Sequence, residues 1–378
     1  MPENDRAGLL SAMDTQALWP PDSPWVRTAV KSLPRDLFAP EIVWSWQGDR
    51  YEAVHRSHDP DAWAAAVHPG PYGTTVTQVT DGLPTSSISC VAIVATMLDT
   101  LAVEEGHRVL ELGTGVGWNA ALLGERTSQV VTVEIDPELG AHARRRLEAA
   151  GCRAEVVIGD GGDPLPGDGL YDRVIATYAV QQVPWSWVRR TRPGGRIVAP
   201  WGHLGCVALT VARDGASATG WMQAPAQFMP DRQERAPRPF ERVRGDDPGA
   251  STQFKRSLRD LQHADALFAL RVLVPDVRLS FSAGDSEPSA VWMTDGRESW
   301  ATIDETGPPP GCSPRRHTRP DRRDHPGVAG MGAPRSARHV RLRAACHRRT
   351  PAGVHRRRPA QPPVASPRSR CSRLVITR

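Results

Sequence analysis

Glycines that follow a short apolar segment are the residues of this chain best suited to binding a small ligand. The segment 108–112, with the letters RVLEL, predicts a buried strand, and Gly113, Gly115 and Gly117 follow it. Glycine allows a sharp turn and lets a ligand approach the main chain closely. The third glycine comes one residue too early for the G-x-G-x-x-G turn of dinucleotide-binding proteins, so the spacing disfavours nicotinamide and flavin cofactors.

An acidic residue after the next apolar segment adds to this interpretation. Glu134 ends the run 130–133, at the position where a carboxylate would bind the hydroxyls of a ribose. A glycine-rich turn alone also fits an ordinary tight turn, and the acidic residue at this spacing is what favours a nucleotide-type ligand. With Glu111 before the first glycine, the string E-x-G-x-G-x-G resembles the first motif of S-adenosylmethionine-dependent methyltransferases, which implies that cofactor.

The elements that would position these residues alternate along the chain. Apolar and amphipathic runs predict strands near 107–112, 130–135, 154–158, 172–177 and 196–200, and helices near 117–126, 137–150 and 184–191. A helix that begins at Ser87 would precede the first strand. The alternation predicts an α/β fold, with a mostly parallel sheet and helices on both faces. Ligands in such sheets bind beyond the carboxyl ends of the strands.

Length and composition divide the chain into four regions. With 378 residues, 39% of them hydrophobic, it is long enough for two domains. We expect an N-terminal helical and irregular region over 1–84, the cofactor-binding core over 85–232, an appended α+β module over 240–306 and an Arg- and Pro-rich tail over 307–378. Within the module, a helix is expected near 256–272 and strands near 276–282 and 289–302.

Other features of composition exclude several classes. The sequence has no apolar run of about eighteen residues, and its first ten residues are too polar for a signal peptide, so we expect neither a membrane protein nor a secreted one. The six cysteines form no C-x-x-C pair, which argues against a zinc site and against a disulfide framework. A reducing, cytoplasmic setting is expected.

The positive charge of the chain lies in one segment. Residues 307–378 contain 18 Arg and only two Asp, which leaves a net charge of −11 on residues 1–306 because the chain total is +5. The pI therefore cannot support a basic groove, and no nucleic-acid partner is expected.

The tail itself is expected to be disordered. It has 12 Pro, no aromatic residue and eight Val, Leu or Ile, too few to offset the entropy of ordering it. It could be an arginine-rich arm that binds an acidic partner. The abrupt change of composition after Thr306 favours the other interpretation, that the tail is the product of a shifted reading frame.

A series of motifs in residues 25–230 resembles the protein-L-isoaspartate O-methyltransferase family. The resemblance rests on seven strings in order: PRDLFAP (34–40), SSISCVAIVATML (86–98), RVLELGTGVGWNAALL (108–123), VVTVEID (130–136), GDGGDPLP (159–166), YDRVIAT (171–177) and RPGGRIVAPWG (192–202). It implies a Rossmann-like methyltransferase fold and transfer of a methyl group from S-adenosylmethionine to the carboxylate of an isoaspartyl or D-aspartyl residue. The ester then closes to a succinimide, which opens to aspartate or isoaspartate and so repairs the protein.

The resemblance also assigns roles to particular residues. In the family, a helix opens with Ile-Ser-Gln-Pro, and its serine contacts both acceptor carboxylate and cofactor; here residues 88–91 read ISCV, so the serine is kept as Ser89 and the next two residues differ. A serine there could also be a helix N-cap. Trp118 would pack over the cofactor. The catalytic residue is then Ser89, and the cofactor-binding residues are Ser87, Glu111, Gly113, Thr114, Gly115, Gly117, Glu134, Asp160 and Gly161.

Two alternatives to repair remain open. Similar proteins with a C-terminal extension methylate an ordinary aspartate of a ribosomally made peptide, and the region 240–306 would then recognise that peptide or serve only in packing. The chain could also be an inactive homologue that binds the cofactor, a view favoured by Cys90 and Val91 in place of Gln and Pro. The expected partner is a protein or peptide bearing the acceptor residue, no metal is expected, and the sequence does not indicate an oligomeric state.

Overall fold

The computed structural model describes residues 2–162, 165–202, 205–233, 238–254, 257–274, 277–282, 290–306, 339–345 and 373–377. Two compact units are formed, one by Met1–Glu234 with Val364–Arg378 and the other by Arg235–Pro363. The boundary between them falls in the interval that the sequence leaves between core and module. Within the first unit, however, a strand crosses the boundary expected between residues 84 and 85.

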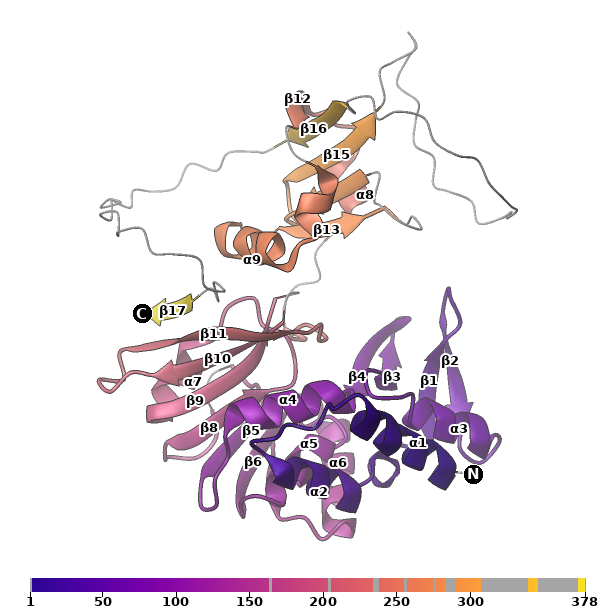
Figure 1. Ribbon diagram of the computed structural model, residues 1–378, viewed down its shortest axis with the longest axis vertical. Helices are drawn as coiled ribbons and strands as arrows, with labels where there is room; N and C mark the ends of the chain where they lie inside the picture. The colour runs from indigo at the N-terminus through magenta and orange to yellow at the C-terminus, as the bar shows by residue number, and fades with distance from the viewer. Residues whose placement is uncertain are drawn as a thin grey trace. The chain divides into compact units, whose positions relative to one another are not determined.

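The first unit is built on a sheet of eight strands in the order β17-β11-β10-β9-β8-β5-β6-β7 (Figure 1). Strands β9, β8, β5, β6 and β7 are mutually parallel, and β10, β11 and β17 extend the sheet antiparallel. The strand bounds are β5 Arg108–Leu112, β6 Gln129–Glu134, β7 Ala154–Ile158, β8 Tyr171–Ala176, β9 Thr191–Trp201, β10 Gly205–Val211, β11 Ser217–Pro225 and β17 Arg373–Thr377. The predicted α/β fold is confirmed.

The order of strands in this sheet defines where a ligand binds. The chain runs from β5 outward through β6 to β7 and then returns to place β8 on the other side of β5. The strand order therefore reverses between β5 and β8. Open α/β sheets bind their ligands at such a switch point, beyond the carboxyl ends of the strands.

Helices cover the sheet as their apolar faces require. They are α4 (Val91–Leu101), α5 (Trp118–Gly124), α6 (Pro137–Ala149) and α7 (Trp185–Arg190). Helix α4 crosses the strands, as Figure 1 shows, and shares one core with α5 and with alternate strand residues such as Val109, Val130 and Ile175. The alternation follows because successive side chains of a strand point to opposite faces. Helix α6 begins after Asp136, whose carboxylate accepts the N–H groups of Glu138 and Leu139 as an N-cap.

A smaller antiparallel sheet precedes this core, in the order β2-β1-β3-β4. The N-terminal elements are α1 (Pro2–Thr15), α2 (Pro24–Ser32), the 3-10 helix η1 (Arg35–Leu37), β1 (Ile42–Trp46), β2 (Tyr51–His55), α3 (Pro60–Val67), β3 (Thr75–Thr80) and β4 (Leu83–Ile88). The prediction of a helix from Ser87 was wrong in its start, because Ser87 and Ile88 pair with Val76 and Thr75 and α4 begins only at Val91. Pairing with β3 in a hairpin makes these residues a strand, although their local sequence pattern favours a helix.

The second unit holds an antiparallel sheet in the order β12-β16-β15-β14-β13. Its elements are α8 (Phe240–Arg244), β12 (Ala250–Phe254), the 3-10 helix η2 (Leu258–Gln262), α9 (Ala264–Leu273), β13 (Arg278–Phe281), β14 (Ala290–Thr294), β15 (Trp300–Thr306) and β16 (His339–Ala345). Leu258, Val291 and Ile303 form its buried core. The α+β content expected of 240–306 is present.

Two short strands lie in the region expected to be disordered. They are β16, which pairs with β12 and β15, and β17, which pairs with β11. Both have strand-like sequences, with Val340 and Leu342 alternating in β16, and this local pattern is not visible in the average composition of the tail. The rest of the predicted disorder lies outside the described residues. Among the helices described, none has the length and apolarity needed to cross a bilayer.

Candidate active site

The glycine turn after β5 lies at the switch point and has the backbone conformation that only glycine adopts readily. The φ angles of Gly113, Gly115 and Gly117 are +93°, +54° and +92°. A Cβ on Gly113 would lie 2.6 Å from Thr177 Oγ1, at the start of the loop that leaves β8. The loops after β5 and β8 are therefore in contact at Gly113, where there is no room for a side chain.

The carboxylate of Glu134, the last residue of β6, binds the main chain of this turn. Its Oε2 accepts the N–H of Gly115 at 2.8 Å, and its Oε1 accepts the N–H of Asp136 at 3.1 Å. A carboxylate offers about four acceptor positions, so two remain for other donors. The fold thus places the carboxylate of Glu134 against the glycine turn.

Glu111 and Thr114 do not face the open end of the sheet. Glu111 is fully buried, with Oε1 accepting from Asn119 Nδ2 at 2.8 Å and Oε2 accepting from Thr132 Oγ1 at 2.6 Å. The Thr132 hydroxyl lies 2.7 Å from that of Thr114. The expectation that these side chains contact a ligand is therefore corrected: Glu111 shares the face of β5 with Val109, so it meets α5 and supports the turn from beneath.

Burial gives Glu111 an unusual titration and a testable effect on stability. Removal from water is the main reason why the pKa of Glu111 is raised to about 7; the charge of Glu134 contributes in the same direction, and the hydrogen bonds from Thr132 and Asn119 oppose it. Below its unfolded pKa of 4.5 the carboxyl holds its proton in both states; between pH 4.5 and 7 only the folded chain holds it, so stability falls as the pH rises through this window.

The substitution Glu111→Gln should remove this pH dependence, because an amide stays neutral and can bond both Asn119 and Thr132. Relative to the wild type, we expect the variant to gain on the order of 3 kcal/mol in free energy of unfolding from pH 4.5 to pH 8. Urea unfolding at several pH values measures it, with the exposed Glu148→Gln as control. Parallel curves for wild type and Glu111→Gln would contradict the assignment.

The turn after β7 carries Asp160 and Gly161 and faces a tyrosine that sequence reasoning missed. Asp160 Oδ1 accepts the N–H of Gly162 at 2.8 Å, and the carbonyl of Gly161 accepts from Trp187 Nε1 at 2.7 Å. The Tyr178 hydroxyl lies so near that a Cβ on Gly161 would be 2.4 Å from it, and the same ring contacts the position of a Gly113 Cβ. Burial raises the pKa of Tyr178, as do nearby carboxylates including Asp160. Tyr178 thus spans the two glycine turns, and only the adjacency of β8 and β5 could have indicated it.

The predicted serines lie on the other side of the glycine turn. A Cβ on Gly115 would meet Ser86 Oγ at 3.7 Å and the carbonyl oxygen of Ser87 at 4.0 Å, so the end of β4 passes directly over the turn. Ser86 is buried and accepts from Thr77 Oγ1 at 3.1 Å. Ser89 follows in the corner between β4 and α4, is partly exposed, and its hydroxyl has no hydrogen-bond partner among the described residues. It is not the N-cap of α4, which is Cys90.

Arg232, which follows β11 in the chain, fastens this hairpin to the end of β6. Its Nη1 lies 3.1 Å from Asp136 Oδ2, and its Nη2 donates to Gln78 Oε1 at 2.8 Å and to the carbonyl of Thr85 at 2.7 Å. Gln78 also donates to Asp136 at 3.1 Å. The hairpin that leads to Ser89 is therefore tied to the loop that follows Glu134.

Trp118 was expected over the cofactor, and the structure contradicts this. Its side chain is 2% exposed and its Nε1 donates to the carbonyl of Leu33 at 2.9 Å, so the ring belongs to the core beneath the turn. The first residue of α5 follows Gly117 with its side chain directed into the helix layer.

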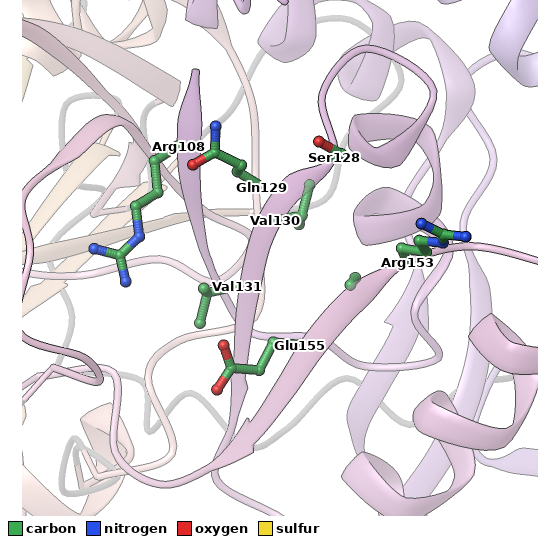
Figure 2. A pocket seen from close by; sticks show the side chains of 8 residues that line it. Arg108, Ser128, Gln129, Val130, Val131, Arg153 and Glu155 are labelled. Carbon is green, nitrogen blue, oxygen red and sulfur yellow. The ribbon is translucent and has the colours of Figure 1, made fainter. Parts of the chain in front are cut away.

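A separate hollow of about 400 Å³ lies elsewhere on the sheet and does not belong to this site. Arg108, Gln129 and Arg153 are among the residues that line it (Figure 2), and they lie at or next to the starts of β5, β6 and β7. It is therefore at the amino ends of the parallel strands, opposite the glycine turn. The candidate active site is the carboxyl end.

Comparison with known proteins agrees with the motifs. The family model of protein-L-isoaspartate(D-aspartate) O-methyltransferase matches residues 21–232. A protein-L-isoaspartate O-methyltransferase of Bradyrhizobium sp. (strain BTAi1) is 44% identical over 117 residues, which cover 31% of this chain and 54% of that protein. A protein-L-isoaspartate O-methyltransferase 2 of Rhodopseudomonas palustris (strain HaA2) is 32% identical over 209 residues, covering 54% and 83%.

Solved structures with related names are similar over longer stretches. One named protein-L-isoaspartate O-methyltransferase has a TM-score of 0.43 and 19% identity, covering 76% of this chain and 84% of its own. Several of the curated relatives are matched over little more than half of their length. The family model spans more than half of this chain, and the chain belongs to the protein-L-isoaspartate(D-aspartate) O-methyltransferase family.

Proposed function

We propose that this chain is an S-adenosylmethionine-dependent carboxyl O-methyltransferase that acts on isoaspartyl or D-aspartyl residues of proteins or peptides. The observation that carries the proposal is one arrangement: a glycine turn at the switch point, held by Glu134, with the end of β4 at Ser86 and Ser87 passing over it, two residues before Ser89. Family membership supports the same activity.

The residues present fit S-adenosylmethionine. Glu134 retains two acceptor positions, which suit the two hydroxyls of a ribose, and Gly115 leaves the main chain open beside β4. Asp160 and Gly161 would lie beside the adenine, with the partly exposed Ile135 offering it an apolar surface. Ser87, Gly113 and Gly117 would complete the binding site, whereas Glu111 and Thr114 would act only by supporting the turn.

The proposed reaction requires no strong acid or base from the protein. S-adenosylmethionine, when bound, supplies a methyl group on a positively charged sulfur. The acceptor carboxylate is ionised at neutral pH, so no strong base is needed. The role left to the protein is to hold the acceptor oxygen in line with the methyl group, an effect that amounts to about 7–11 kcal/mol in well-oriented systems. We assign the orienting hydrogen bond to the unpartnered hydroxyl of Ser89.

Methyl transfer to a matched pair of peptides tests the proposal. The pair differs only in an isoaspartyl or a normal aspartyl residue, and labelled S-adenosylmethionine reports transfer. We expect label on the isoaspartyl peptide alone. Label on the aspartyl peptide would instead favour the peptide-tailoring alternative, and label on neither, with cofactor binding intact, would favour the inactive homologue.

The regions outside the core are assigned as part of the same proposal. We propose that 85–232 carries cofactor and catalysis, that 1–84 supplies the cover over it and that 240–306 is an appended module. The cysteines Cys90, Cys152 and Cys206 are free, which supports a reducing, cytoplasmic setting.

A further inference from the structure

Arg35, in the PRDLFAP motif, is a buried cation with no ion-pair partner among the described residues. It is 1% exposed. The neighbouring acid, Asp36, is turned to His68, with 3.3 Å between its Oδ1 and His68 Nε2. Burial lowers the pKa of Arg35 to about 10, which still leaves the guanidinium charged at neutral pH. A charge buried in this way is unfavourable unless other groups compensate it.

Neutral acceptors hold this guanidinium, and they lie at or next to the start of β3 and at the end of β4. Its Nη2 donates to the carbonyl of Ile88 at 2.9 Å and to Thr75 Oγ1 at 3.0 Å, and Nη1 donates to the carbonyl of Gly73 at 3.4 Å. Ile88 directly precedes Ser89. The guanidinium carbon also lies 5.7 Å from the ring centroid of Trp118, which follows Gly117.

These contacts give Arg35 two physical effects on the same corner. The hydrogen bond to Ile88 fixes the peptide that leads into Ser89 and hence the direction of its hydroxyl. The second effect is electrostatic: the acceptors of the guanidinium are neutral, so its charge has no counter-ion among the described residues, and a buried charge is weakly screened. An acceptor carboxylate bound at Ser89 would supply the negative charge that the guanidinium of Arg35 lacks.

We propose that Arg35 is a positioning residue that fixes the Ile88–Ser89 corner and serves as the buried counter-charge for the acceptor carboxylate. The inference rests on the proposed function, since it requires an anionic acceptor at Ser89. It predicts a preference for charge that a merely structural arginine would not produce.

Peptide binding by calorimetry tests the counter-charge. The full-length protein, saturated with S-adenosylhomocysteine, is titrated with an isoaspartyl peptide and with the same peptide bearing an amide in place of the free α-carboxylate of the isoaspartyl residue. We expect the wild type to bind the carboxylate form at least tenfold more tightly, and Arg35→Met to reduce this ratio to near one. Arg173→Met is the matched control, because Arg173 also donates to carbonyls, of Ala102 and Asp172, but lies at the opposite ends of the strands.

Arg35→Lys separates the two effects and serves if Arg35→Met does not fold. Lysine keeps the charge but cannot reach all three acceptors, so the ratio should stay within about threefold of the wild type while kcat falls at least tenfold. An unchanged ratio in folded Arg35→Met would overturn the counter-charge, and wild-type kcat in Arg35→Lys would overturn the positioning. A wild-type protein that binds neither peptide would instead overturn the proposed acceptor, and this inference with it.

Discussion

Replacing Glu134 by glutamine is expected to weaken the binding of S-adenosylhomocysteine by about 10- to 100-fold. The amide keeps one acceptor oxygen but loses the charge and at least one position for a ribose hydroxyl. A hydrogen bond to a charged group contributes about 1.5–3 kcal/mol, and each 1.4 kcal/mol is about tenfold in affinity. Calorimetric titration of wild type and variant measures the change.

A cofactor analogue without the ribose 2′-hydroxyl makes this test specific. The wild type should lose affinity for the analogue, whereas Glu134→Gln should bind both ligands about equally, which shows that the carboxylate and the hydroxyl are coupled. Glu138→Gln, on an exposed residue of α6, is the control. Equal losses in wild type and variant would place the ribose elsewhere.

The sequence predicts the central sheet well because its elements are locally determined. Each strand predicted between 107 and 200 contains a short apolar run, and the start of α6 has its own signal in the Asp136 cap followed by Pro137. Glu134 and the glycine turn could be paired in advance since the carboxyl ends of adjacent parallel strands meet at one edge. Local pattern and global fold agree throughout this part of the chain.

The errors arise where long-range contacts decide. Residues 86–88 continue into an apolar helix in sequence, but pairing with residues 75–78 makes them a strand. Glu111 was expected at the ligand because of its motif. The alternation of side chains along β5 places it instead on the face covered by α5, where Asn119 donates a hydrogen bond to its carboxylate. Arg232 bonds Gln78, which lies 154 residues away, and no local signal predicts such a contact.

Ser89→Ala is expected to lower kcat for methyl transfer by about 100-fold and to leave cofactor affinity within twofold. The hydroxyl lies in the corner that follows the end of β4, and loss of an orienting bond would misplace the acceptor oxygen, for which about 10²-fold is a typical consequence. If the bond were made equally in the ground state, KM would rise instead and kcat would stay. Steady-state kinetics on the isoaspartyl peptide, with both substrates varied, separates the two.

Two further variants show whether the hydroxyl itself is responsible. Ser89→Thr keeps a hydroxyl at this position and should retain most of kcat. Ser86→Ala removes a hydroxyl three residues away that is already bonded to Thr77, so it should leave kcat within a few fold. If Ser89→Ala and Ser86→Ala have the same modest effect, the hairpin matters only as a cover, and acceptor orientation must come from main-chain groups of the same corner, which Arg35 holds through Ile88.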